Sequence, residues 1–187
     1  MGTTATHHGH PTREVAAIEV RPARPSDLPA LLAFFDRCSP ESHYQRFHGA
    51  AGPAVRHEID RIATWSATHR SWVAIAPGDP ATIVGTATLA WGSLDDVEVA
   101  CLVEDGWMRH GIGRRLFGAL VAHAAEEGLE LLLARIQGGN ERARRFLRTV
   151  APGARTRFVG SGEFEVDLPV RPAATLAAGV SLLLETA

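Results

Sequence analysis

The sequence contains few of the residues that build covalently linked or metal-held folds. Cys38 and Cys101 are the only cysteines in 187 residues, and they form no Cys-x-x-Cys pair. Neither a disulfide framework nor a thiolate metal site is therefore predicted. The formal net charge is −2, which gives the whole chain no bias toward nucleic acid or anionic membranes. Any anion site must be local, and a reducing, cytoplasmic setting is the simplest expectation.

Long apolar runs are also missing. No run reaches the roughly 20 residues of a membrane span; residues 171–187 come nearest, and Gly179 and Ser181 interrupt them. Residues 1–15 lack the apolar stretch of a secretory signal and are expected to form a disordered tail. We therefore expect one domain over residues 16–170, long enough for a full core, with residues 171–187 as an extension of undetermined role.

The first half of that domain shows helical and then strand-like periodicity. A short strand over residues 17–23 precedes helices that begin at two expected N-caps, Ser26 and Ser39, and a third helical stretch over 54–65. The pattern then changes to β-branched and apolar runs separated by turn residues. These runs predict three successive antiparallel strands, at residues 71–77, 82–91 and 97–105.

The second half alternates helices and strands. Apolar residues at four-residue spacing predict a helix from Ile112 to near Gly128. The apolar run 129–136 is typical of a strand covered on both faces, and a short basic helix and two closing strands follow, at residues 140–150 and 155–168. The fold class is therefore α/β (α+β): a single domain with a mixed, mostly antiparallel sheet of about seven strands flanked by about four helices.

The stretch WMRHGIGRRL, residues 107–116, places bases where a helix begins. A helix start normally favours acids, because its free N–H groups give that end a partial positive charge. Gly111 and Gly113 would let the backbone approach an anion such as a phosphate. A Walker loop is excluded because Gly-Lys-Ser/Thr is absent, and a Rossmann fingerprint because Leu116 replaces its third glycine. The alternative is a glycine-rich turn with a solvated basic face.

The segment VEVACLVEDGWMRHGIGRRLFGALVAHA resembles the acyl-CoA-binding motif of the GNAT superfamily of N-acetyltransferases. LELLLARIQGGNERARRFL resembles the next strand and helix of that family, with Asn140 at the usual asparagine. RPARPSDLPALLAFFDRCSPESHYQRF is similar to the N-terminal segment of a subgroup that includes bacterial protein-lysine acetyltransferases. The resemblance spans about residues 17 to 168 and implies a GNAT-like fold with acetyl-CoA as cosubstrate and no metal.

The resemblance implies a role for each matching position. The main chain of the loop would wrap the CoA pyrophosphate, through Met108, Arg109, His110, Gly111, Ile112, Gly113 and Arg114. Leu102 and Val103 would bind the pantetheine arm and polarise the thioester carbonyl, and Asn140 would bind the same arm. Glu98 falls where several members place a general base. The implied reaction is acetyl transfer to a primary amine, with protein lysine as the first expectation for the acceptor.

The sequence also departs from the family pattern. Leu147 occupies the position of the tyrosine to which protonation of the leaving thiolate is commonly assigned, and the only tyrosine is Tyr44. Met108 replaces the usual Gln/Arg, which main-chain anion binding tolerates. These departures leave a non-catalytic acyl-CoA sensor or assembly subunit as an alternative, and a nucleotide-binding module as a weaker one.

Several single residues have both a functional and a plain structural interpretation. Glu98 could be a strand-end carboxylate that pairs with an arginine, and Cys101 an inert buried thiol. Glu41, Tyr44 and Arg46 are candidate contacts for the acceptor, or capping, packing and solvated residues of a short helix. The expected partners are acetyl-CoA and an amine, a protein lysine or a small molecule, with a homodimer as an option and neither nucleic acid nor membrane.

Overall fold

The structure is a computed structural model that describes residues 18–48, 53–92 and 96–170. The expected N-terminal tail and the C-terminal extension lie outside these residues. Within them the chain forms seven strands, five α-helices and two 3-10 helices, which we list in chain order. They are β1 (Glu19–Pro22), η2 (Pro25–Asp27), α1 (Leu28–Arg37), α2 (Pro40–Phe47), α3 (Pro53–Ala63), β2 (His69–Ile75), β3 (Ile83–Trp91), β4 (Val97–Val103), η3 (Asp105–Trp107), α4 (Ile112–Glu126), β5 (Leu131–Gln137), α5 (Glu141–Val150), β6 (Arg155–Gly160) and β7 (Glu163–Pro169).

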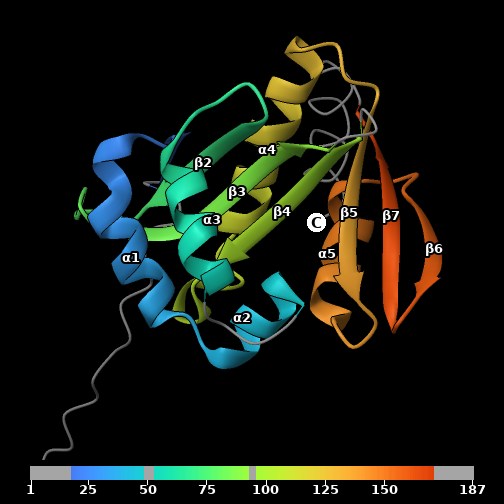
Figure 1. The fold of residues 1–187 in the computed structure, drawn as a ribbon, viewed down its shortest axis with the longest axis horizontal. Helices are drawn as coiled ribbons and strands as arrows, with labels where there is room; N and C mark the ends of the chain where they lie inside the picture. The colour runs from blue at the N-terminus through green and yellow to red at the C-terminus, as the bar shows by residue number, and fades with distance from the viewer. Residues whose placement is uncertain (1–17, 49–52, 93–95, 171–187) are drawn as a thin grey trace, which may run out of the picture.

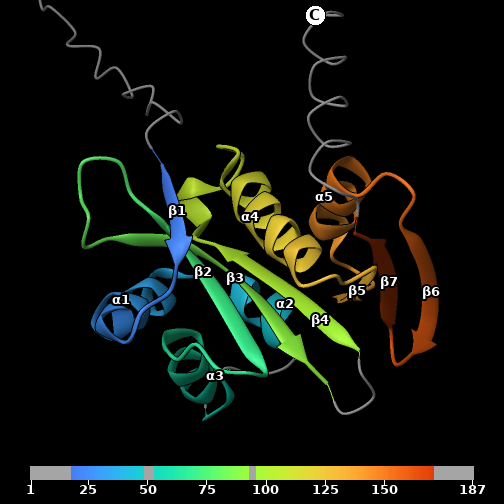
Figure 2. The ribbon, with the colours of Figure 1, turned by 90° about the horizontal axis from the view of Figure 1, so that it is seen from above.

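All seven strands belong to one sheet, in the order β1-β2-β3-β4-β5-β7-β6. Neighbouring strands are antiparallel except β4 and β5, which pair in parallel. Helices α4 and α5 lie on one face of the sheet, and α1, α2 and α3 lie on the other (Figures 1 and 2). The expected mixed sheet of seven strands and the antiparallel meander are confirmed, with five α-helices in the described residues where about four were expected.

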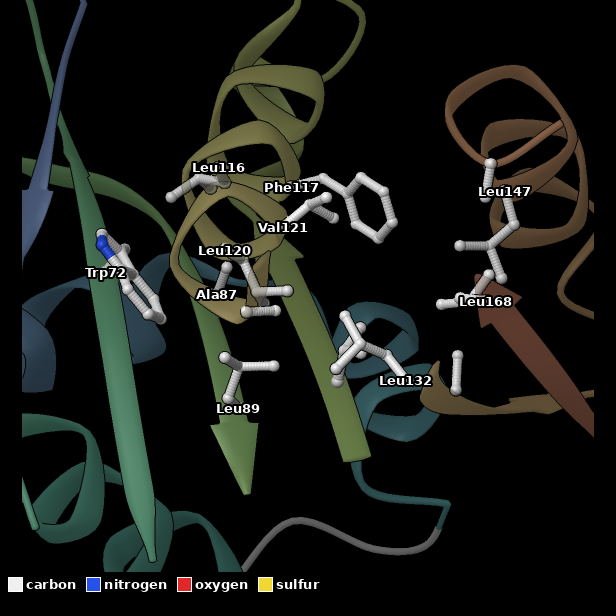
Figure 3. Close-up of a cluster of buried hydrophobic side chains, with 14 of the residues drawn as sticks. Trp72, Ala87, Leu89, Leu116, Phe117, Leu120, Val121, Leu132, Leu147 and Leu168 are labelled. Atoms are coloured by element: carbon white, nitrogen blue, oxygen red, sulfur yellow. The ribbon is translucent and has the colours of Figure 1, made fainter. Parts of the chain in front are cut away.

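The larger apolar core joins α4 to the sheet. The four α4 residues that the periodicity singled out, Ile112, Leu116, Leu120 and Ala124, are at most 1% exposed. Figure 3 shows Leu116 and Leu120 beside Trp72, Ala87 and Leu89, while Leu132, Leu147 and Leu168 lie across from Phe117 and Val121. Gly85 of β3 permits the close approach, because a Cβ there would lie 3.0 Å from Cδ1 of Leu116. This contact fixes the first turns of α4 against the sheet.

A second core lies on the other face, between α1, α3 and the strands β2 and β3. Leu31, Phe34 and Phe35 of α1 are buried there. The expected N-cap Ser26 is wrong: it lies within η2, and Asp27 is the N-cap residue of α1. The carboxylate of Asp27 instead accepts hydrogen bonds from the Arg24 N–H and from the Arg21 guanidinium. Helix α1 therefore begins one residue later than the sequence predicts.

Strand β5 is only partly covered. Leu132, Leu133, Ala134 and Ile136 are buried, whereas Leu131 is 51% exposed and Arg135 is exposed. The expectation of a strand covered on both faces is therefore wrong for the α2 side, where Leu131 and Arg135 emerge beyond the cover of α1 and α3. No helix in the three described ranges is both long and apolar enough to span a bilayer.

Candidate active site

The site is built where β4 and β5 separate. The two strands pair at Glu98 and Leu133, and Figure 1 shows them diverging from that end. The space between them is a cavity of about 960 Å³. Its walls come from β4, the loop before α4, α5 and α2. Because β4 leaves β5, the backbone groups along that edge of β4 are available to a ligand.

The loop before α4 has backbone conformations that expose its amides to the cavity. Gly111, the N-cap residue, has φ 74°, and Arg109 has φ 65°. The Arg115 N–H donates to the Gly111 carbonyl at 3.1 Å, so the amides of residues 112–114 precede the first bond of the helix. None of the side chains that the structure describes caps this helix start. A Cβ on Gly113 would reach Cε2 of Phe146 at 3.5 Å. The loop thus presents free donors and little bulk to an anion.

Most of the residues named from the sequence meet in this cavity. Those that line it are Glu41, Arg46, Glu98, Leu102, Val103, Met108, Arg109, Gly111, Gly113, Arg114 and Asn140. Three do not. The Ile112 side chain is 1% exposed and packs in the core, and Tyr44 is 47% exposed outside the lining. His110 lies against its own loop, with Nδ1 2.8 Å from the Met108 carbonyl. Most of the residues that the sequence predicts for acetyl-CoA binding therefore lie together, while the roles assigned to them stay predictions.

Asn140 has a structural role of its own. It is the N-cap of α5, and its side-chain oxygen accepts a hydrogen bond from the Ala143 N–H at 2.9 Å. The side chain nevertheless lines the cavity. Its amide –NH₂ makes no hydrogen bond to the described residues and is the part that can donate to a ligand.

Glu98 does not stand alone in the cavity. Its Oε2 lies 2.8 Å from Nη1 of Arg135, whose Nε is 3.2 Å from Oε1 of Glu165. Sequence reasoning named Glu98 and anticipated an arginine partner, but it missed Arg135 and Glu165. The signal that was available is the single arginine inside the otherwise apolar run LLLARI. Arg46 is likewise paired, with Glu58 of α3.

The remaining candidate groups are unreactive near neutral pH. Burial raises the pKa of the Cys101 thiol to about 12, so the thiol stays protonated near neutral pH and is a poor nucleophile. Leu147, at the position of the usual tyrosine, is 7% exposed and belongs to the core. Among the described residues no group of three or more His, Cys, Asp or Glu side chains could hold a metal ion.

Comparisons with known proteins identify the family and the fold of this chain. Residues 18–150 match the family model of the acetyltransferase (GNAT) domain. Among solved structures, the GNAT domain of S. lividans PAT is 20% identical, with 81% of this chain and 90% of that chain covered and a TM-score of 0.71. The paia N-acetyltransferase of Thermoplasma acidophilum, solved with coenzyme A, is 14% identical. The match covers 81% of this chain and 98% of that chain, with a TM-score of 0.63. The yncA protein of Salmonella typhimurium, solved with its cofactor acetyl-CoA, is 18% identical. The match covers 84% of this chain and 96% of that chain, with a TM-score of 0.61.

Proposed function

This chain belongs to the family of GNAT acetyltransferase domains, and from that premise we propose that it transfers an acetyl group from acetyl-CoA to a primary amine. The observation that carries the proposal is the cavity between β4 and β5, with the uncapped start of α4 at its wall. A long, narrow donor with a phosphate group near one end fits such a cavity. The start of α4 would hold the phosphate group, and the edge of β4 would hold the arm that carries the thioester.

The donor half of the site uses mainly backbone groups. The amides of residues 111–114 and the partial positive charge of the α4 N-terminus favour the pyrophosphate. Leu102 and Val103 line the cavity at the end of β4, and an N–H there, aimed at the thioester carbonyl, would stabilise the developing oxyanion by about 3 kcal/mol. The Asn140 amide would donate to the same arm from the opposite wall.

The acceptor half needs a neutral nitrogen, since an alkylamine is protonated near neutral pH. Glu98 is the carboxylate that we propose takes the proton, directly or through water, as the amine attacks. Arg135 occupies one of its oxygens, Oε2, and Oε1 is left for the amine or the water. The amine and the thioester would be held together in one complex, so the acetyl group passes directly between them. The leaving thiolate is protonated by water, because Leu147 cannot donate a proton.

We propose a protein lysine as the acceptor. The support is the likeness of residues 21–47 to the lysine-acetyltransferase subgroup and the open, charged surface beside the cavity. There, Arg157, Glu165 and Asp167 of β6 and β7 lie on the sheet face that also carries Glu98 and Arg135. Figure 2 shows β6 and β7 extending past the helices on that side. Such a surface suits an extended polypeptide better than a small amine, which remains the alternative acceptor.

A second candidate function is an acyl-CoA sensor or assembly subunit without turnover. Leu147 at the position of the family's tyrosine and the occupied oxygen of Glu98 favour it. It predicts tight CoA binding with no acetyl transfer to any amine.

The experiment that separates the two is a thiol-release assay with purified protein, acetyl-CoA and a panel of amines that includes lysine-rich protein and polyamines. The enzyme should release CoA only when an acceptor is present, and mass spectrometry should find the acetyl group on that acceptor. CoA binding by calorimetry without transfer to any member of the panel would instead support the sensor. Tighter binding of ATP or NAD than of CoA would overturn both.

A further inference from the structure

Helix α2 forms a wall of the cavity, and its start contacts the donor loop, the segment 104–111 between β4 and α4. Six residues of this helix and its end line the cavity: Glu41, Ser42, Gln45, Arg46, Phe47 and His48. In Figure 1, α2 lies between the end of β4 and the pair of α5 and β5. It therefore crosses the open end of the gap between the two strands, on the face where Glu98 meets its acceptor in the proposed reaction.

The helix has little apolar packing to hold it there. Of its eight residues only Ser42 is buried, and the main apolar contact is Phe47, whose ring centroid is 6.1 Å from that of Phe35. An isolated helix of this length is unstable in water. Polar contacts therefore contribute to its position, among them the Arg46–Glu58 pair and the approach of His43 Nε2 to the Phe35 carbonyl at 2.9 Å.

The contact at the start of α2 is made by Asp105. Its Oδ2 accepts the Ser39 N–H at 2.9 Å, and its Oδ1 accepts the Ser39 and Ser42 hydroxyls, each at 2.9 Å. Burial raises the pKa of Asp105, but these hydrogen bonds outweigh it and hold the pKa below its ordinary value. The carboxylate is thus charged at neutral pH and can accept all three bonds. At the other end of α2, His48 Nδ1 lies 2.8 Å from Glu163 Oε1 of β7.

Asp105 also lies at the start of the donor loop. It opens η3, and its carbonyl accepts the Met108 N–H at 3.3 Å. The preceding Glu104 is fixed by Arg37 at the end of α1, with Nε to Oε2 at 3.0 Å. Asp105 therefore joins the loop that precedes α4 to the first turn of α2, which we call the acceptor wall.

We propose that Asp105 is a positioning residue that couples the donor loop to α2, so that a CoA molecule bound at residues 108–114 orders the acceptor wall. This inference rests on the proposed function, because it takes CoA as the ligand of the loop. A ligand that fixes the loop fixes the Asp105 carboxylate, and with it the Ser39 and Ser42 end of α2. Coupling between sites is reciprocal, so an acceptor that holds α2 in place strengthens donor binding by the same factor.

The test is hydrogen exchange of the α2 amides, residues 41–47, with and without saturating CoA. In the wild-type protein CoA should slow exchange in α2 by about fivefold or more, at the lower end of typical coupling between sites. In Asp105→Asn, which loses charge and one acceptor oxygen, CoA should still bind within a few-fold of wild type, but the slowing in α2 should disappear. Ser42→Ala removes one of the three bonds and should give an intermediate effect, even if Asp105→Asn proves unstable.

The matched control is Asp79→Asn. Asp79 also accepts a backbone N–H and a hydroxyl, from Ala81 and Thr82, but it does not line the cavity. This variant should retain the full response in α2. CoA binding with no change in α2 exchange in the wild-type protein, or an unchanged response in both Asp105→Asn and Ser42→Ala, would overturn the coupling alone. Wild-type protein that binds no CoA would overturn the proposed function as well.

Discussion

The guanidinium of Arg135 lies 2.8 Å from Glu98, the carboxylate to which the proposed mechanism assigns proton removal. The two side chains come from different strands, β5 and β4, near the point where these strands pair. A second carboxylate, Glu165 of β7, holds Arg135 from the other side at 3.2 Å. Glu98 is therefore an oriented carboxylate whose direction is set across three strands of the sheet.

This relationship predicts non-additive effects on catalysis. Glu98→Gln should lower kcat by about 100-fold or more, since a positioned base contributes that much. Arg135→Gln, which removes the orientation but keeps the carboxylate, should cost about tenfold. The double variant should be no slower than Glu98→Gln alone, because Arg135 acts only through Glu98. Steady-state rates of thiol release measure all three.

Glu165→Gln is the intermediate member of that series, since it keeps the direct Arg135–Glu98 pair but removes the charge that holds Arg135 from β7, and it should slow the reaction less than Arg135→Gln does. Full activity of Glu98→Gln would remove Glu98 from the mechanism. An additive double variant would show that Arg135 has a separate role.

A second prediction concerns Gly113 at the cavity wall. A Cβ there makes an ordinary contact with Phe146 at 3.5 Å, so Gly113→Ala should fold and gain the helix propensity of alanine, about 0.5 to 1 kcal/mol. The same methyl group occupies the wall where the pyrophosphate approaches. CoA affinity by calorimetry should therefore fall by about tenfold, or 1.4 kcal/mol, although the protein becomes no less stable.

Gly118 of the same helix provides the matched control, because a Cβ there meets nothing within 4 Å. Gly118→Ala should gain similar stability and bind CoA like wild type. Equal CoA affinity in both variants would place the anion away from the start of α4.

The order of elements could be read from the sequence because each depends on local patterns. The meander follows from β-branched runs, α4 from the spacing of Ile112 and Leu116, and α2 from the Ser39 cap, whose hydroxyl accepts the Ser42 N–H. The glycines at 111 and 113 likewise marked the donor loop. Such features need only neighbours in the chain.

The contacts that organise the acceptor side could not be read in this way. Arg135 and Glu98 are 37 positions apart, and Asp105 and Ser39 are 66 apart. These pairs form only because the sheet order brings their elements together. Tyr44 shows the reverse: its residue type suggested a role in the site, yet it does not line the cavity because the helix turns it outward.

A third prediction concerns stability. Asp27 is 7% exposed and accepts two hydrogen bonds of 2.7 Å from Arg21. Asp27→Asn leaves the Arg21 charge without its partner and should lower the free energy of unfolding by about 2 to 3 kcal/mol. Asp60→Asn, on an exposed pair with Arg56, should change it by less than about 0.5 kcal/mol. Urea denaturation at pH 7 makes the comparison.

The same carboxylate predicts a loss of stability in acid. The hydrogen bond from Arg21 holds the pKa of Asp27 below its ordinary value. The stabilisation is therefore complete above the unfolded pKa of about 3.9 and is lost as pH falls from there through the folded pKa. The difference between wild type and Asp27→Asn should shrink below about pH 4, and a constant difference would contradict the assignment.

The last prediction uses a different pH range. His69 is 3% exposed, and burial, reinforced by the nearby Arg61 charge, lowers its pKa to about 4. Its Nδ1 lies 2.8 Å from Nη2 of Arg61, so the neutral ring accepts a bond that a protonated ring could not. An unfolded histidine has a pKa of about 6.5, and the unfolded chain thus binds the proton first as the pH falls. Stability is complete above pH 6.5 and should decline by about 3 kcal/mol toward pH 4.

His69→Gln removes the titration and should flatten the profile between pH 6.5 and pH 4.5, at the cost of lower stability at pH 7. Urea denaturation at half-unit steps over this range compares this variant with the wild type. An equally steep profile in His69→Gln would mean that groups other than this buried imidazole carry the pH dependence, because after the substitution the site has no proton left to exchange.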